Sequence, residues 1–191
     1  MTGYNMKKEK TSMLKFSGLM VLLAVFFIAG CGYTTRSLLP SNYKTIYVDN
    51  FKNGINVTAE QNNLRMYRGY RPGMEISLTK AVIDRYLFDG NLKMRQDEKA
   101  DLILRGELID YKRDALRYDA NDNIEEYRIK IIINMSLIDG KTGAVIWTEK
   151  GFAGETTYST VGSTAKSDEA GVTDAMADLA RRVVERTVEA W

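Results

Sequence analysis

The chain has 191 residues, with 27 lysines and arginines, 25 aspartates and glutamates, one cysteine and no histidine. The lack of histidine, together with the single cysteine, excludes the usual zinc ligand sets and the Ser-His and Cys-His nucleophile pairs. One cysteine also leaves no disulfide within the chain.

The N-terminal segment has the layout of a bacterial secretion signal. Four lysines precede an apolar run from Phe16 to Ile28, and the small residues Ala29 and Gly30 follow it. This order is typical of a cleaved signal, and the run is shorter than the about 20 apolar residues that span a bilayer. Because a small residue stands directly before Cys31, the segment resembles a lipobox, which implies cleavage there, a diacylglyceryl thioether on the sulfur and an acylated new N-terminus. The alternative is an uncleaved N-terminal anchor in which Cys31 is incidental.

Cleavage at this point divides the chain into a signal peptide (1–30), a lipidated tether (31–42) and a folded domain (43–191). The mature chain has 161 residues, which suits one domain with a single core. It carries 23 basic and 24 acidic side chains, a net charge of −1, and so lacks the basic excess of a nucleic-acid-binding protein. Gly32 favours the outer membrane under the sorting rule of enteric bacteria, and several acyl chains would hold the protein firmly on its periplasmic side.

The first part of the domain predicts one strand and one helix. Residues 43–49 alternate and are rich in β-branched and aromatic side chains, which is typical of a strand. Residues 51–71 are polar and have no period, so we expect a long loop. A helix is predicted over 72–89, because a proline opens the segment, apolar residues follow at helical spacing, and Gly90 is a stop signal. Residues 92–95 are compatible with a short strand.

Three long strands are predicted next. Segments 101–118 and 124–137 flank an Asn-Asp-Asn turn, and apolar and polar residues alternate in the second segment, which indicates one buried and one wetter face. A hairpin connection at 139–143 leads to the third strand, 144–157. The Gly-Lys-Thr of this hairpin resembles the end of a phosphate-binding loop. However, the first glycine of that motif is missing and a strand, not a helix, follows, so we reject it.

The last predicted element is an amphipathic helix over 168–189. Ser167 can cap it, and Asp168 and Glu169 suit the positive end of a helix. The element order strand, helix, three strands, helix predicts an α+β domain, in which two helices pack on one face of a roughly four-stranded mixed or antiparallel sheet. The other face of the sheet is left to water or a partner.

The candidate binding residues are five basic side chains that mix with aromatic residues in the predicted hairpin. They are Lys112, Arg113, Arg117, Arg128 and Lys130. Arginine and lysine suit phosphate groups, and aromatic rings suit sugars and acyl boundaries. We therefore interpret the cluster as a contact for an anionic amphiphile or for the acidic lining of a partner. The alternative is cross-strand pairing with Asp114, Glu125 and Glu126. A second basic-aromatic stretch at 65–71 has the same character.

Seven short segments of the mature chain carry a family resemblance. They are CGY (31–33), LP (39–40), YKTIYVDNF (43–51), ADLILRGE (100–107), YDA (118–120), EYR (126–128) and LIDGKTGAVIW (137–147). Together with the closing helix, they resemble the LptE family of lipopolysaccharide-assembly lipoproteins. The family implies a two-helix, four-strand domain that is tethered inside the outer membrane, plugs the LptD β-barrel and helps deliver lipopolysaccharide to the outer leaflet. Of the family's functional residues only Cys31 carries over, and segment 51–71 is longer than the family's usual link into the first helix.

We therefore expect a non-enzymatic partner of an LptD-type barrel and of lipopolysaccharide, with no cofactor beyond the covalent lipid on Cys31. Two alternatives stay open. A free periplasmic lipid-binding or transport lipoprotein without a barrel partner would hold a deep apolar cavity between sheet and helices. A lipid-anchored hydrolase would need clustered carboxylates in a pocket, and the absence of histidine disfavours it.

Overall fold

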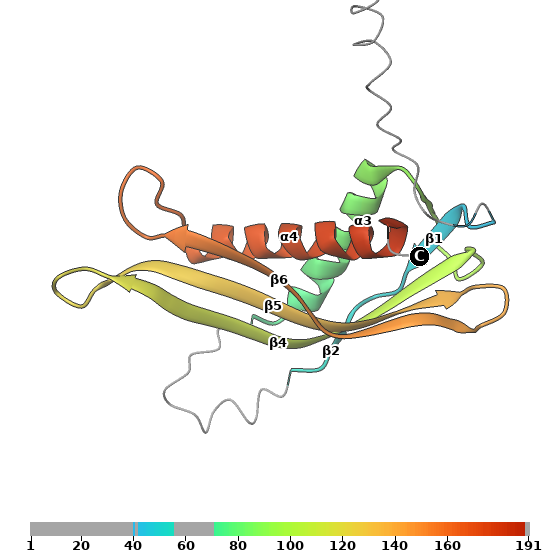
Figure 1. Ribbon diagram of the computed structural model, residues 1–191, viewed down its shortest axis with the longest axis horizontal. Coiled ribbons are helices and arrows are strands. Elements are labelled where there is room, and N and C mark those ends of the chain that lie inside the picture. Colours follow the sequence, from blue (N-terminus) through green and yellow to red (C-terminus); the bar gives the residue numbers. More distant parts are fainter. Residues whose placement is uncertain (1–39, 41, 56–70, 190–191) are drawn as a thin grey trace, which may run out of the picture. The chain divides into compact units, whose positions relative to one another are not determined.

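The computed structural model describes residue 40, residues 42–55 and residues 71–189. The predicted signal, Cys31, most of the tether and most of the predicted loop at 51–71 lie outside the described residues. Those residues form a mixed sheet and two helices (Figure 1). The strands are β1 (Thr45–Val48), β2 (Lys52–Asn53), β3 (Lys93–Met94), β4 (Leu102–Tyr118), β5 (Ile124–Asp139) and β6 (Val145–Ser159), and the helices are α3 (Met74–Asp89) and α4 (Asp168–Glu189).

The sheet has the strand order β3-β1-β4-β5-β6, and β2 also pairs with β4. Strand β1 runs parallel to β3 and β4, whereas β4, β5 and β6 are antiparallel. This arrangement confirms the predicted α+β class and element order. The sheet has six strands where about four were expected, because two strands of two residues each add to it. Strand β2 falls in the segment predicted as a loop, since two residues are too few to show an alternating pattern.

The two helices lie on the same side of the sheet, as Figure 1 shows. Helix α3 begins two residues later than predicted, because Gly73 takes a left-handed conformation with φ 89° directly before it. The predicted stop is confirmed: Gly90 has φ 74° and donates its N–H to the Tyr86 carbonyl. Helix α4 has the predicted bounds, and the Ser167 hydroxyl accepts the N–H of Ala170 at 3.2 Å, which confirms the predicted cap.

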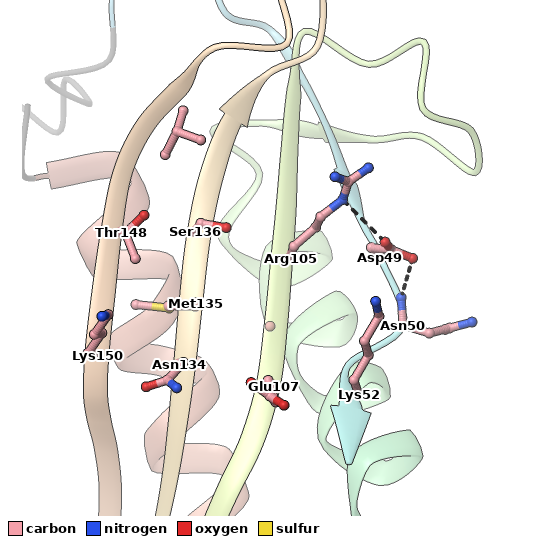
Figure 2. Close-up of a pocket in the computed structure, with 12 residues that line it drawn as sticks. Asp49, Asn50, Lys52, Arg105, Glu107, Asn134, Met135, Ser136, Thr148 and Lys150 are labelled. Atoms are coloured by element: carbon pink, nitrogen blue, oxygen red, sulfur yellow. Dashed lines mark hydrogen bonds and ion pairs between the residues drawn. The ribbon is translucent and has the colours of Figure 1, made fainter. Parts of the chain in front are cut away.

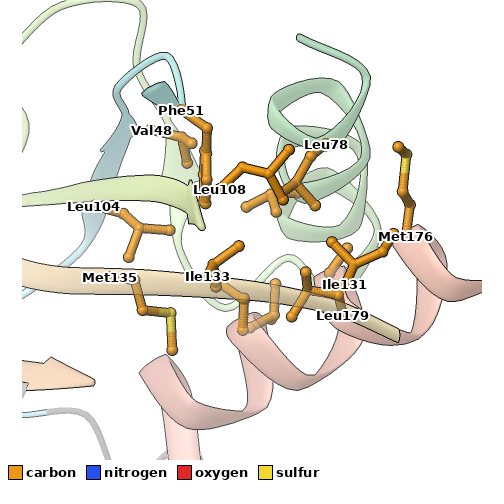
Figure 3. Packing of buried hydrophobic residues seen from close by; sticks show 14 of the residues in the cluster. Val48, Phe51, Leu78, Leu104, Leu108, Ile131, Ile133, Met135, Met176 and Leu179 are labelled. Atoms are coloured by element: carbon orange, nitrogen blue, oxygen red, sulfur yellow. The ribbon is translucent and has the colours of Figure 1, made fainter. Parts of the chain in front are cut away.

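Alternation along β5 determines which face of the sheet is buried. Ile129, Ile131 and Ile133 are completely buried, and the residues between them are partly exposed. The buried face meets Leu78 of α3 and Leu179 of α4, and both of these leucines are completely buried too (Figure 3). Each such side chain contributes about 1.5–3 kcal/mol through its removal from water. The sheet is therefore apolar toward the helices.

Helix α4 approaches β6 closely at Gly154. A Cβ atom on Gly154 would lie only 2.5 Å from the backbone nitrogen of Leu179, so the position requires glycine. The two helices are joined near their C-terminal ends, where the buried Tyr86 hydroxyl donates to the hydroxyl of Thr187 at 2.7 Å. Burial raises the pKa of Tyr86 far above its usual range. Both contacts hold the helices over one face of the sheet.

Candidate functional site

The register of β4 and β5 separates the five predicted basic residues onto the two faces of the sheet. Residues directly opposite each other in an antiparallel pair project to the same face. Lys112 lies opposite Lys130, whereas Arg113 lies opposite the buried Ile129. Lys112, Arg128 and Lys130 therefore lie on the face without helices, and Arg113 lies on the side of the helices.

Lys112, Arg128 and Lys130 form a basic group on the helix-free face. Lys112 lies between Asp110 and Asp114 on this face, and its Nζ is 3.4 Å from an oxygen of Asp110. Among the described residues, neither Arg128 nor Lys130 makes an ion pair, although Asp114 lies opposite Arg128 in β4 and Glu155 lies opposite Lys130 in β6. Like charges directly opposite one another repel. An anionic group bound between Lys112 and Lys130 would relieve this repulsion.

Arg117 lies near the turn between β4 and β5, apart from this group. Its Nε is 3.0 Å from a carboxylate oxygen of Glu125. This is the cross-strand pairing that the sequence offered as the alternative to ligand binding. Both side chains are substantially exposed, so the pair contributes little to stability.

Arg113 belongs to a network around Asp168, the first residue of α4. Its Nη1 lies 2.9 Å from Oδ1 of Asp168, and its guanidinium carbon lies 4.5 Å from the centre of the Tyr127 ring. The Tyr158 hydroxyl donates to the same oxygen at 2.9 Å, and Arg71 binds the other oxygen at 2.8 Å. Burial alone would raise the pKa of Asp168, but the donors from Arg113 and Tyr158 outweigh it and hold that pKa below its usual value. Arg113 is therefore engaged within the fold through Asp168 and the Tyr127 ring.

A shallow depression of about 420 Å³ lies on the helix-free face beside β2 (Figure 2). Its polar lining comes from four strands and the segment after β1, and it comprises Asp49, Asn50, Lys52, Arg105, Glu107, Asn134, Ser136, Thr148 and Lys150. Arg105 is engaged, with its Nε 3.5 Å from an oxygen of Asp49. Lys52 and Lys150 make no ion pair within the described part of the chain. Ammonium, hydroxyl and amide groups in one depression suit hydrogen bonding to phosphate and sugar oxygens.

The depression and the basic group belong to one continuous strip of the helix-free face. Along β5, the positions that project to this face run from Ser136 and Asn134 through the apolar Ile132 to Lys130 and Arg128. Sequence reasoning missed Lys52, Arg105 and Lys150, since they lie in segments up to about a hundred residues apart. The sequence did carry one signal for two of them. Side chains alternate between the two faces of a strand, and the neighbours of Arg105 and Lys150 in the predicted strands are apolar or face the helices.

The space between the sheet and the helices is filled with side chains. Leu108, Tyr111 and Ile131 are at most 1% exposed there, and so are Leu78 and Leu179 of the helices. Such packing does not match the deep apolar cavity expected of a lipid carrier. No three metal-ligating side chains cluster among residues 42–55 and 71–189. Neither α3 nor α4 is both long and apolar enough to cross a bilayer.

Comparison with known proteins gives one family match. The family model LptE, described as lipopolysaccharide-assembly, matches residues 43–187. A comparison with curated proteins finds no match.

Several solved structures are similar to this chain at low identity. A point variant of PelC from Paraburkholderia phytofirmans, a dodecamer, is 15% identical with a TM-score of 0.45, and the match covers 81% of this chain and 96% of that one. XCC0632 from Xanthomonas campestris is 16% identical with a TM-score of 0.47, covering 78% and 85%. The rare lipoprotein B from Shewanella oneidensis is 14% identical with a TM-score of 0.39, covering 74% and 92%.

Proposed function

Because the chain belongs to the LptE family, the lipopolysaccharide-assembly family, we propose that it is an outer-membrane lipoprotein that plugs an LptD-type β-barrel and assists the transport of lipopolysaccharide to the outer leaflet. The family match over residues 43–187 is the observation that carries this proposal. It covers every helix and strand of the described domain except the last two residues of α4. The protein acts by binding and has no catalytic step.

The packing of the domain supports a plug over a free carrier. A carrier needs an internal apolar space for acyl chains, whereas here the space between sheet and helices is occupied by buried side chains such as Leu108 and Leu179. The helix-free face is polar and carries hydrogen-bonding side chains from four strands. A water-filled barrel interior is polar as well, so this face suits a barrel lining.

The basic group of Lys112, Arg128 and Lys130 is the proposed contact for lipopolysaccharide. Two of its three cations, Arg128 and Lys130, have no ion-pair partner within the described chain. The group lies on the same strip of the helix-free face as the depression, which is lined by Lys52 and Lys150. Phosphate groups on the saccharide part of lipopolysaccharide match this chemistry. Arg113 and Arg117 are not part of the proposed contact, because each is paired within the fold.

The proposed anchor is Cys31. The signal (1–30) is removed, Cys31 carries a diacylglyceryl thioether and an N-acyl group, and residues 31–42 tether the domain (43–191) to the periplasmic side of the outer membrane. Three acyl chains on one residue hold a protein permanently, since each buried methylene contributes about 0.8 kcal/mol.

Co-purification tests the barrel partnership. The lipidated protein is tagged, solubilised in mild detergent and isolated, and we expect a large outer-membrane β-barrel to accompany it in a defined ratio. A Lys130→Glu variant should retain less barrel than a Lys80→Glu variant, whose substitution lies on the exposed side of α3 away from the helix-free face. Clean isolation as a monomer, together with normal surface lipopolysaccharide after depletion, would contradict the proposal and favour a free carrier.

A further inference from the structure

Two large apolar side chains are exposed next to each other at the C-terminal end of α3. Leu87 is 62% exposed and Phe88 is 80% exposed, and the helix ends at Asp89. The guanidinium carbon of Arg85 lies 5.2 Å from the centre of the Phe88 ring. Neither Leu87 nor Phe88 belongs to the core. Exposed apolar side chains mark contact surfaces where they gather, and two large ones at one helix end point to a candidate surface.

This end of α3 lies where the chain enters the domain. Three residues after Gly90, Lys93 begins β3 and pairs with Thr45 at the start of β1. The Lys93 N–H donates to the carbonyl of Lys44 at 2.9 Å. Figure 1 shows the last turn of α3 joined by a short connection to this part of the sheet. Leu87 and the first described residues therefore share one end of the sheet.

The length of the tether limits how far this end can be from a membrane. Cys31 lies nine residues before Pro40, the first described residue. An extended chain spans about 3.4 Å per residue, so the cysteine cannot lie more than about 30 Å from Pro40. With Cys31 lipidated, as proposed above, the C-terminal end of α3 is held near the bilayer surface.

The charges around the apolar pair suit an anionic lipid surface. Lys44 and Lys93 are exposed beside each other at the sheet edge. Of the two neighbouring acids, Asp84 pairs with Lys80 at 2.5 Å, whereas Asp89 accepts two N–H groups of Asn91 and keeps its negative charge. Apolar side chains flanked by lysines are the usual composition of a segment that lies in a membrane interface.

We propose that Leu87 and Phe88 form a membrane foot, which inserts between the headgroups of the leaflet that holds the lipid of Cys31. The inference rests on the proposed lipid anchor and is independent of the barrel partner. Two side chains bind a bilayer weakly when free in solution, but a short tether keeps them at a high effective concentration beside it. The foot orients the domain, with the turn between β4 and β5 at the other end of the sheet.

The test places an environment-sensitive fluorophore on the lipidated full chain in vesicles of phosphatidylethanolamine and phosphatidylglycerol. Because lipid blocks Cys31, a Leu87→Cys variant is labelled at one position. The matched control is Val161→Cys, which is 46% exposed and follows β6 at the end remote from the tether. Strand β6 alone has 15 residues, or about 50 Å at 3.3 Å per residue. We expect blue-shifted emission and at least two-fold stronger quenching by a lipid-borne quencher at position 87 than at position 161.

A second variant guards against insertion of the fluorophore itself. Adding Phe88→Ser to Leu87→Cys should return the emission toward that of the aqueous control, and folding should be unaffected because Phe88 lies outside the core. Equal, water-like emission at both positions in protein that floats with the vesicles would overturn the foot and leave the anchor intact. Blue-shifted emission at position 87 that the lipid-borne quencher does not reduce would also overturn the foot. In that case part of the chain, and not lipid, would cover Leu87. Protein without acyl mass on Cys31 that fails to float would refute the anchor and, with it, the foot.

Discussion

Arg113 and Asp168 form a 2.9 Å ion pair that ties β4 to the first residue of α4. Each side chain is only about a quarter exposed, and the Tyr158 hydroxyl shares the same carboxylate oxygen. The carboxylate also lies at the positive end of the helix, where a negative charge is favourable. The pair therefore sets where α4 begins over the sheet.

Replacing Arg113 should destabilise the domain. An Arg113→Met variant removes one of the donors to the partly buried Asp168 and removes the guanidinium from the Tyr127 ring. We expect the free energy of unfolding in urea to fall by about 1–3 kcal/mol. Lys112→Met is the matched control, one residue away on the more exposed face, and should change it by less than about 0.5 kcal/mol. Equal losses in the two variants would contradict the structural role of Arg113.

Protonation of Asp101 should lower the stability of the domain in acid. A hydrogen bond from Lys141 and the backbone N–H of Lys44 hold the pKa of Asp101 far below its usual value. A carboxylate with a lowered folded-state pKa stabilises the fold above its unfolded pKa of about 3.9, and this stability is lost as the pH falls. Urea midpoints at pH 6 and pH 3 should therefore differ less for Asp101→Asn than for the unmodified chain. Lys141→Met should reduce the difference as well, and identical pH dependence in all three proteins would contradict the assignment.

Gly154 should tolerate no larger side chain. A Cβ atom there would meet the backbone of Leu179 at 2.5 Å, so α4 would have to move away from β6. We expect Gly154→Val to lower the free energy of unfolding by about 1–3 kcal/mol, as overpacking usually does. Ala153→Val, one residue away and facing the helix-free side opposite Ile132, should cost clearly less. A thermal melt of each variant checks the difference.

Reversing charge in the basic group should weaken lipopolysaccharide binding. The double variant Lys112→Glu, Lys130→Glu removes two facing cations and should reduce the affinity of the purified protein for lipopolysaccharide at least ten-fold at low salt. The effect should shrink as the salt concentration rises, because exposed charges are screened. A double variant of equal charge change, Lys80→Glu with Lys166→Glu, lies outside the helix-free face and is the control. Equal loss in both double variants would show that only net charge matters.

Much of the fold was predictable from local patterns. The alternation in β5 and the stop at Gly90 are properties of a few neighbouring residues, and the structure has them where they were expected. Strand β2 was not predictable, because two residues have no period and become a strand only through pairing with Glu107 and Leu108. Helix α3 starts late because Gly73 takes a backbone conformation that spacing does not encode.

The candidate site was predictable only in part. The basic residues of β4 do not form one cluster, because Lys112 and Arg113 are consecutive in a strand and project to opposite faces. Their alternation was visible in the sequence, but the partner of Arg113 was not, since Asp168 is remote in the chain. The depression was missed for the same reason, because Lys52, Arg105 and Lys150 meet only through sheet topology.

The measurement that tests the proposed role in lipopolysaccharide assembly most directly is the amount of lipopolysaccharide in the outer leaflet after depletion of this protein from its own cells. The proposed function predicts that surface lipopolysaccharide falls while newly made lipopolysaccharide accumulates inside, and that the unmodified chain restores the surface level. An unchanged surface level in fully depleted cells would contradict it.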